Sequence, residues 1–204
     1  MPPARPVNAA LKRGLDFVVS LIGLVLASPL LLAAAIAVKL DSRGPLLFRQ
    51  QRMGRNFRPF WIYKFRTMVV DAERQGQLTA AADPRVTRVG RWLRQSKLDE
   101  LPQFFNVLRG DMSLVGPRPE VPKYVELFRD EYRVVLSVRP GLTDPASIKY
   151  RDEAALLAGS PDPERQYLEQ ILPDKLAIAS DYLRRATVLT DLGVMARTVL
   201  RVAR

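Results

Sequence analysis

The stretch Phe17–Val38 (FVVSLIGLVLASPLLLAAAIAV) is a long apolar run without a charged residue, and it decides where this chain can fold. As a straight α-helix it would measure about 33 Å, enough to cross the hydrocarbon core of a bilayer. A cleaved signal peptide is the alternative, because basic residues precede the run. The run is too long for an ordinary signal-peptide core, and basic sequence follows it instead of a cleavage site. We therefore predict a membrane element.

Two features of the run argue against a simple transmembrane span. Pro29, preceded by Ser28, removes a backbone hydrogen bond in mid-helix and kinks the helix there. Positive charge lies on both flanks, and positively charged flanks tend to stay in the cytoplasm. A re-entrant helix broken at Ser28-Pro29, within a membrane-inserted segment 1–40, satisfies both observations, and a kinked single-pass anchor is the alternative. The flanking cations are Lys12, Arg13, Lys39, Arg43, Arg49, Arg52, Arg55 and Arg58.

The composition narrows the chemistry available to the rest of the chain. Its 204 residues include no Cys and no His, which excludes disulfides, thiolate nucleophiles, Ser-His-Asp triads and zinc sites built on imidazole. Catalysis would depend on carboxylates, Arg, Lys, hydroxyls, backbone groups and a hard cation such as Mg²⁺. The net charge of +11 calls for an anionic partner, which is nucleic acid, an anionic membrane surface or a phosphorylated small molecule.

A β-hairpin is predicted directly after the apolar run. Pro45–Arg52 and Phe57–Phe65 are rich in aromatic and aliphatic residues, and a Gly-Arg-Asn turn at 54–56 separates them. Basic residues alternating with aromatic ones resemble a nucleic-acid platform. Beside a membrane segment, such a surface more often lies on anionic lipid headgroups. Lys64 and Arg66 would equally serve as solvated charges of the hairpin.

The second half of the chain is predicted to be mainly helical. A helix begins near Ser96 or Asp99, with Pro102 in its first turn, and ends at Arg109-Gly110. An amphipathic helix follows at Glu120–Leu136, and residues 170–204 are predicted to form one or two helices with a cationic end. The fold class is therefore α+β, mainly helical. We expect residues 41–204 to form a cytoplasmic catalytic domain whose amphipathic helices lie on the membrane surface.

Asp99 and Glu100 form an adjacent pair of carboxylates ahead of a stiff Pro117-Arg118-Pro119 loop. On a helix their side chains diverge by about 100°, so they need not share one task. The alternative is a helix N-terminus with favourable acids and a surface turn. A carboxylate is an accepted nucleophile toward phosphorus and needs no general base at neutral pH, which suits a chain without His. An arginine can stabilise the charge of phosphoryl transfer.

Three segments in this order carry a resemblance to a known family. They are KFRTM (64–68), LDELPQFFNVLRGDMSLVGPRP (98–119) and VRPGLT (138–143). Together they resemble the bacterial sugar transferases, the monotopic polyprenyl-phosphate phosphoglycosyl transferases, from Lys12 to about Asp191. The resemblance implies the small form of the family, with a re-entrant helix at Ser28-Pro29.

The resemblance also implies an activity. Family members transfer a sugar-1-phosphate from a UDP-sugar to undecaprenyl phosphate and release UMP, at the first membrane step of glycoconjugate or exopolysaccharide synthesis. Asp99 would be the nucleophile of a ping-pong mechanism, and Glu100 would help to hold Mg²⁺ on the diphosphate. The expected location is the cytoplasmic face of the bacterial inner membrane, among anionic lipids. A homo-oligomer is left open.

Further site residues follow from the family's motifs. Arg151 matches a phosphate-binding arginine, but the segment before it departs from the family's usual Gly-Trp-Ala-Gln-Val-Asn-Gly and reads DPASIKY (144–150). Asp191 matches an acid of the last helix and would equally be an ordinary helix charge. The residues expected to bind substrate or phosphate are Lys64, Arg66, Pro117, Arg118, Pro119, Arg139, Arg151 and Asp191.

Two other functions remain as alternatives. One is a non-catalytic, membrane-bound scaffold of polysaccharide assembly that keeps the fold without turnover. The other, suggested by charge alone, is a membrane-tethered nucleic-acid binder. It is disfavoured because the Asp99-Glu100 pair would repel a phosphate backbone in the absence of a metal. We therefore expect no nucleic-acid partner.

Overall fold

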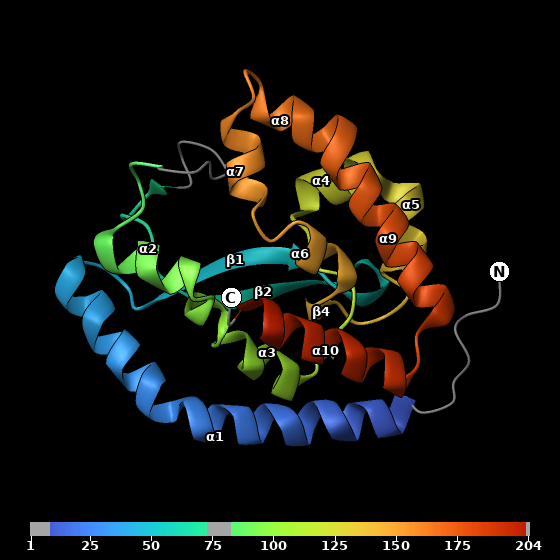
Figure 1. Cartoon of the computed structure of the whole chain (residues 1–204), viewed down its shortest axis with the longest axis horizontal. Helices are drawn as coiled ribbons and strands as arrows, with labels where there is room; N and C mark the ends of the chain where they lie inside the picture. Colours follow the sequence, from blue (N-terminus) through green and yellow to red (C-terminus); the bar gives the residue numbers. More distant parts are fainter. Residues whose placement is uncertain (1–8, 73–82, 203–204) are drawn as a thin grey trace.

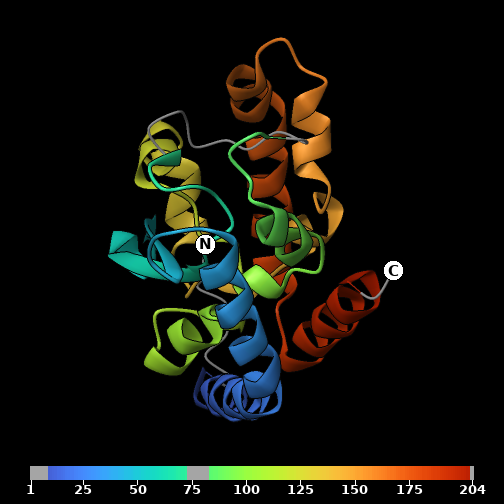
Figure 2. The same ribbon diagram turned by 90° about the vertical axis from the view of Figure 1, so that its left-hand side faces the viewer.

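The computed structural model describes residues 9–72 and 83–202, which form a mainly helical α+β fold. The N-terminal helix runs along the base of the molecule, and the other elements lie above it around a central two-stranded hairpin (Figure 1). In the side view the C-terminal helix stands apart from the upper helices (Figure 2). The predicted fold class is confirmed.

Helix α1 (Ala9–Asp41) contains the whole apolar run. It continues through Pro29 and is bent partway along its length (Figure 1). Proline is the usual cause of such a bend, because it lacks the N–H that the preceding turn needs. The Ser28 hydroxyl donates to the carbonyl of Val25 at 2.7 Å and accommodates part of that disruption. The helix is thus bent, while its helical geometry is continuous.

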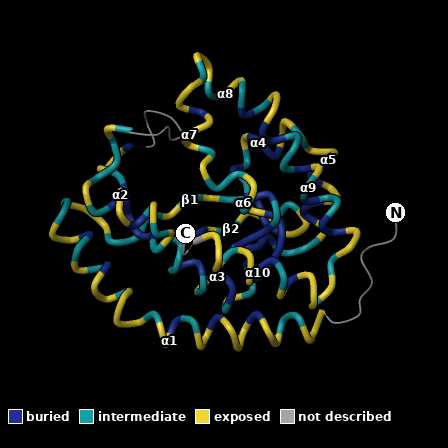
Figure 3. Tube along the Cα trace, viewed as in Figure 1, coloured by how far each residue is buried: buried dark blue, intermediate teal, exposed yellow. Residues whose placement is uncertain are grey.

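The outer surface of α1 is apolar and exposed. Leu26 is 76% exposed and Leu40 is 83% exposed, and the underside of the helix is exposed along much of its length (Figure 3). By length and composition α1 could cross a membrane, and 17% of its most apolar window is buried. A core helix of a soluble domain would instead be mostly covered by other elements. This exposure is what a membrane protein would show.

The hairpin consists of β1 (Leu47–Met53) and β2 (Pro59–Phe65), which pair antiparallel with Leu47 opposite Phe65. The connecting turn places Asn56 at a positive φ of 56°, a conformation that asparagine adopts more readily than most residues. The hairpin prediction is confirmed, with strands slightly shorter than expected. The end of β2 leads into the KFRTM segment.

A second, shorter strand pair was not predicted. β3 (Ser113–Val115) pairs parallel with β4 (Gly141–Thr143). The backbones are so close that a Cβ atom on Gly141 would lie 2.1 Å from the Gly116 nitrogen. Only glycine fits such an approach. The contact fixes the start of the loop that carries Arg118.

Helix α3 (Gln103–Arg109) begins later than predicted. Its N-cap is Pro102, so neither Ser96 nor Asp99 caps it. Asp99 instead lies in a separate 3-10 turn that precedes the helix. The chain forms a tight turn here instead of a helix, because Lys97, the residue before the turn, adopts a left-handed conformation that a helix excludes. The predicted end of the helix at Gly110 is confirmed, with Gly110 at a φ of 88°.

The helix predicted over Glu120–Leu136 is interrupted. The structure has two short helices, α4 (Pro122–Leu127) and α5 (Arg129–Val135), separated at Phe128. Phe128 has φ −120° and ψ 40°, which are not helical angles. The break lets both helices pack their buried faces onto one core.

The remaining helices complete the upper part of the molecule and its C-terminal side. The predicted C-terminal helical region resolves into two helices, with a π-helical turn at Tyr167–Ile171 leading into the first of them. Within residues 9–72 and 83–202, three apolar clusters hold the elements together, and one of them joins α1 to β2 and to the first helix after the hairpin. The remaining helices are α2 (Arg88–Gln95), α6 (Pro145–Lys149), α7 (Glu153–Ala158), α8 (Pro163–Gln166), α9 (Leu172–Arg185) and α10 (Val188–Val202).

Candidate active site

The acid pair lies in the turn between α2 and α3. Lys97 has a positive φ of 59°, which ends the preceding helical turn and directs Leu98–Glu100 into a 3-10 turn. Both Asp99 and Glu100 line a cleft of about 1260 Å³. The end of β2, the loop after β3 and the segment from β4 to α7 line the same cleft. The acids are therefore placed where a ligand of substantial size can reach them.

Glu100 is held by two cations from different parts of the chain. Its Oε1 accepts from Lys64 Nζ at 2.7 Å and from Arg118 Nη2 at 2.5 Å. Arg118 Nη1 also donates to Oε2 at the longer distance of 3.3 Å. Burial by itself raises the Glu100 pKa, but Arg118 and Lys64 overcome that effect and hold the pKa well below its usual range. Glu100 is thus a permanent anion that fixes both cations in the cleft.

Asp99 is the opposite case. Its side chain is buried, with 6% of the residue exposed, and its Oδ1 has no hydrogen-bond partner. Burial raises the Asp99 pKa above its ordinary value, and the nearby charge of Lys64 only partly opposes this. A buried carboxylate oxygen without a partner costs free energy, so native structures rarely keep one without a reason. Among the acids of this turn, Asp99 is therefore the one that keeps a carboxylate oxygen without a hydrogen bond.

A further cation, Arg94, lies near Asp99 and was not singled out from the sequence. Its Nε donates to the Thr67 hydroxyl at 2.9 Å, and its side chain lines the cleft. Burial lowers the Arg94 pKa, and the charge of Asp99 is the main opposing effect. The available sequence signal was its place on a basic amphipathic helix shortly before the acids. The pattern did not show which of the helix's arginines turns inward.

The Pro117-Arg118-Pro119 loop is fixed by its neighbours. The carbonyl of Pro117 accepts from the Gly141 nitrogen at 2.9 Å, and the carbonyl of Pro119 accepts from Arg52 at 3.2 Å. Glu120, the next residue, accepts from the same Arg52 at 2.9 Å. The guanidinium of Arg118 therefore extends into the cleft from a rigid backbone, as the sequence predicts.

Glu120 joins this loop to the helices above it. Besides Arg52, it accepts hydrogen bonds from the nitrogen of Val121 and from the hydroxyl of Tyr167. Tyr167 begins the π-helical turn before α9. Burial, and then the charge of Glu120, raise the pKa of Tyr167, so its hydroxyl stays a donor. The Arg118 loop is thereby tied to both β1 and the upper helices.

Two other predicted binding residues lie in the cleft lining, with different roles. Arg151 lines the cleft as the resemblance implies. Arg66 also lines it, but its guanidinium is buried and donates to the carbonyl and hydroxyl of Ser42 at 2.6 and 2.9 Å, and to Pro45. These contacts connect β2 to the end of α1. They favour a structural role for Arg66 over phosphate binding.

Arg139 and Asp191 do not line the cleft. Arg139 Nε donates to the carbonyl of Gly110 at 2.8 Å, at the end of α3. Asp191 is buried and accepts from Lys12 of α1 and from the hydroxyl of Tyr182. These contacts favour a structural role for both residues. The expected binding role came from local motifs, whereas these contacts arise from long-range packing that a local motif does not show.

The geometry defines a class of site. A buried carboxylate with a free oxygen lies in the cleft beside a carboxylate that is already paired with two cations. Such a site suits covalent capture of a phosphoryl group, because the cations can hold an anionic substrate while the free oxygen attacks. Comparison with known proteins agrees with this class. The family model described as "Bacterial sugar transferase" matches residues 7–204, and the chain belongs to that family.

Several curated relatives are more specific. The chain is 42% identical to the UDP-glucose:undecaprenyl-phosphate glucose-1-phosphate transferase of Caulobacter vibrioides, over 92% of this chain and 68% of the relative. It is 48% identical to the UDP-N-acetylgalactosamine-undecaprenyl-phosphate N-acetylgalactosaminephosphotransferase of Aeromonas hydrophila, over 70% of this chain. It is 39% identical to the undecaprenyl-phosphate galactose phosphotransferase of Salmonella typhimurium, over 74% of this chain. The matched region spans about a third of the length of the last two proteins, 35% in each case.

Proposed function

We propose that this protein transfers a sugar-1-phosphate from a UDP-sugar to undecaprenyl phosphate, giving a polyprenyl-diphospho-sugar and UMP. The relatives named above act on such substrates, and this chain shares their family over nearly its whole length. The observation that carries the proposal is the unpartnered, buried Oδ1 of Asp99 beside the Lys64–Glu100–Arg118 ion pairs.

The reaction proceeds in two displacements at phosphorus. In the first, a carboxylate oxygen of Asp99 attacks the sugar-bearing phosphorus, and the bond to the bridging oxygen breaks so that UMP leaves. In the second, an oxygen of the lipid phosphate attacks the same phosphorus and releases the Asp99 carboxylate. Arg118 and Lys64 stabilise the charge on the phosphoryl oxygens in both steps. No general base is needed, because a carboxylate and a phosphate are already nucleophilic anions.

Mg²⁺ belongs to the same proposal. Magnesium is usually held by one or two carboxylates together with substrate phosphates and water. The described residues contain no group of three or more acids placed to bind a metal by themselves, so the ion would depend on the diphosphate. Glu100 Oε2, whose one hydrogen bond is long at 3.3 Å, would hold the ion together with the diphosphate, which leaves the Asp99 carboxylate to attack. When bound, the ion would neutralise the diphosphate and so lower the repulsion of the attacking carboxylate.

The contacts of α1 support a re-entrant membrane helix. Near its N-terminus, Arg13 donates to the carbonyls of Val107 and Leu108 at 2.5 and 2.8 Å. At its other end, Asp41 accepts from the nitrogen of Val89 at 3.0 Å. Both ends of α1 thus contact the same folded body. If α1 crossed the bilayer, its two ends would lie on opposite sides of the membrane and could not both contact that body. We place this body on the cytoplasmic face of the inner membrane, in contact with anionic lipids, where it would begin glycoconjugate or exopolysaccharide synthesis.

The test of the activity is direct. Purified protein is incubated with UDP-sugars, Mg²⁺ and undecaprenyl phosphate, and the nucleotide product is measured. Release of UMP, with a phosphosugar adduct in the mass spectrum when the lipid is omitted, is the expected result. UDP as the product would indicate an ordinary glycosyltransferase, and no turnover with any donor would favour a scaffold. An adduct that persists in Asp99→Asn would refute the assigned nucleophile.

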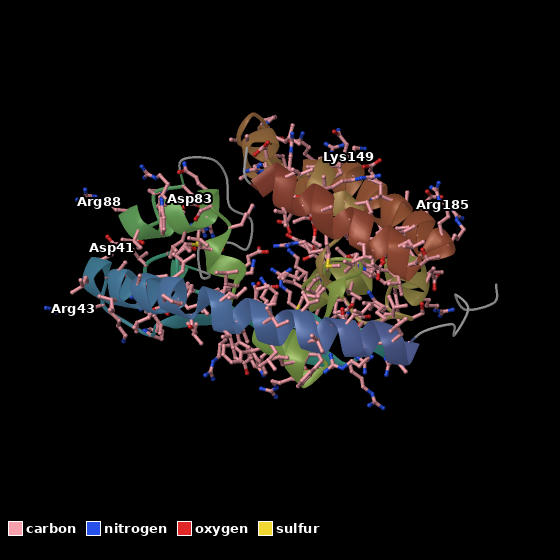
Figure 4. All side chains as sticks on the ribbon, turned by 60° about the horizontal axis from the view of Figure 1, so that its bottom comes forward. Asp41, Arg43, Asp83, Arg88, Lys149 and Arg185 are labelled. Carbon is pink, nitrogen blue, oxygen red and sulfur yellow. The ribbon has the colours of Figure 1, made fainter. Side chains whose placement is uncertain are left out.

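The topology has its own test. Because the chain contains no cysteine, single cysteines introduced at Ala9 and Arg43 can be labelled without a background. Arg43 lies at the far end of α1, beyond the labelled Asp41 (Figure 4). A membrane-impermeant reagent is expected to label both positions from the cytoplasmic side only. Labelling from opposite sides would establish a transmembrane span instead.

A further inference from the structure

The cleft continues beyond Arg118 to a second polar wall, which nothing above assigns to a ligand. This wall consists of Tyr150, Glu153, Tyr167 and Lys175, from the end of α6 to the start of α9. At its centre the ammonium of Lys175 forms an ion pair with Glu153. The side chains of the pair are 17% and 26% exposed, so both charges are largely removed from bulk water. We call these four residues the distal wall.

The Lys175–Glu153 pair needs an explanation beyond stability. Taking two charges out of water costs about as much free energy as their attraction returns, and an apolar pair of similar size often serves a fold equally well. Both residues of the pair also line the cleft, where replacing them with apolar side chains would leave the fold unchanged. Its position therefore points to a ligand that needs both a hydrogen-bond donor and an acceptor.

The distal wall is electrostatically continuous with the catalytic end of the cleft. Arg118, which binds Glu100 on one side, also interacts with the charges of Asp144 and Glu153 on the other. A donor substrate whose diphosphate lies at Arg118 would consequently present its next group to this wall. In a UDP-sugar that group is either the sugar or the nucleoside.

The aromatic rings of the wall favour the sugar. Lys175 lies over the rings of Tyr150 and Tyr167, at 5.7 and 5.1 Å from their centroids, and Lys149 lies over Tyr150 at 5.3 Å. Rings already covered by cations are poorly placed to stack on a planar base. A sugar ring instead requires donors and acceptors for its hydroxyls, which Lys175 and Glu153 provide.

We infer that the distal wall binds the hexose of the donor and that Glu153 and Lys175 determine which sugar is accepted. This inference rests on the proposed function. A carboxylate and an ammonium discriminate hydroxyl orientation strongly, because a hydroxyl in the wrong orientation loses a hydrogen bond to a charged group. The segment 144–150, which departs from the family's usual pattern, leads into this wall and would thereby affect the preference.

The test compares donors that differ only in the sugar. The efficiency of UMP release is measured for UDP-glucose, UDP-galactose and their N-acetylated counterparts in wild type, Glu153→Gln and Lys175→Met. The ratio between the best and the other donors is expected to change about 10- to 100-fold, the range set by loss of one hydrogen bond to a charged group. Inhibition by UMP, which lacks the sugar, is expected to stay unchanged.

A matched control is present in the chain. Lys149 also lies over Tyr150 and pairs with an acid, Asp174, but it does not line the cleft. Figure 4 shows it at the outer surface, on the side away from α1. Lys149→Met is expected to leave the donor ratios as they are. Thermal unfolding of all three variants identifies any loss of fold.

Two results would overturn the inference while leaving the proposed function intact. If wild type releases UMP and all donors decline by one common factor in the Glu153 and Lys175 variants, the wall does not select the sugar. If UMP inhibition weakens by that same factor, the wall holds the nucleoside. If wild type neither binds nor cleaves any UDP-sugar, the proposed function itself is wrong, and this inference falls with it.

Discussion

Two buried aspartates, Asp99 in the cleft and Asp191 between α10 and α1, show how differently this fold treats the same side chain. Asp191 is 7% exposed and Asp99 is 6% exposed, so burial does not separate them. Asp191 accepts from Lys12 and from Tyr182, whereas Asp99 keeps an oxygen without any partner. The difference lies in hydrogen-bond satisfaction. A satisfied buried carboxylate stabilises an interface, while an unsatisfied one is held ready for a ligand or a reaction.

The surroundings of each aspartate support this distinction. Asp191 belongs to a region that docks α1 onto the body, where Asp16 likewise accepts from the Leu114 nitrogen at 3.0 Å. Asp99 lies on a turn that lines the cleft, where Lys64 and Arg118 pair with its neighbour Glu100 instead. The predictions below use matched substitutions in the two regions.

The largest effect is expected for Asp99→Asn. Loss of the nucleophile should reduce UMP release by about 10⁴-fold or more, because the amide cannot form the covalent intermediate. The same substitution should raise the melting temperature by about 2–4 °C, since it removes a buried charge that the fold disfavours. Activity and thermal unfolding measured on one preparation check both parts. A variant that is inactive and also less stable would place Asp99 among the structural residues.

The size of that stability gain depends on pH. Burial raises the Asp99 pKa in the folded state. The ionised carboxylate therefore lowers the free energy of unfolding, and this cost reaches its full size at pH values above the raised pKa. The cost disappears as the pH falls below the ordinary aspartate range, where the group is protonated in both states. The gain from Asp99→Asn should therefore be present at pH 7 and vanish toward pH 3. An equal gain at both pH values would mean that desolvated charge is not its cause.

Asp191→Asn is expected to give the reverse pattern. It weakens the contact to Lys12 and should cost about 2 kcal/mol, or about 4–8 °C in melting temperature. The folded fraction should keep the turnover of wild type, because Asp191 does not line the cleft. Turnover per folded molecule is the deciding measurement. A loss of turnover without a loss of stability would restore Asp191 to the substrate-binding residues that the family resemblance implies.

The family resemblance assigned separate roles to Asp99 and Glu100, but the sequence did not show which of the two acids pairs with the cations. Order and spacing placed Asp99, Glu100 and Arg118 in one motif, and the structure brings all three to one cleft. Which acid pairs with the cations depends on Lys64, 36 residues before Glu100 in the chain, and on a left-handed Lys97 that rotates the turn. Neither the side chain's direction nor the turn follows from local propensity, because tertiary contacts select them.

Parts of the fold were hidden for similar reasons. The strands β3 and β4 have three residues each, too few to show an alternating pattern. The break at Phe128 lies inside a continuous amphipathic pattern that predicts one helix. The hairpin and α1 were predictable, because long periodic or apolar segments carry their own signal. For Arg139 and Asp191, a motif match cannot reveal the contacts with Gly110 and Lys12 that favour a structural role.

A smaller effect is expected for Lys64→Met, which tests how the cations control Asp99. The charge of Lys64 lowers the Asp99 pKa, in opposition to burial, so its removal should raise that pKa further. Activity requires the carboxylate, so the acidic limb of the pH profile for UMP release should move upward by about one pH unit. Lys64→Arg restores the cation and should return the limb toward the wild-type position. An unshifted limb in Lys64→Met would show that another group controls the profile.

The smallest effects are expected for two tyrosines that make the same kind of hydrogen bond in the two regions. Tyr167 donates to Glu120 behind the Arg118 loop, and Tyr182 donates to Asp191 in the α1 docking region. Each change to phenylalanine should cost about 1 kcal/mol of stability, because one hydrogen bond is lost while the ring is kept. Only Tyr167→Phe should also lower turnover, by about two- to fivefold, since the Arg118 loop loses one of its supports. Equal effects on turnover would mean that the loop's position does not depend on Glu120, and that satisfaction of buried carboxylates does not separate the two regions.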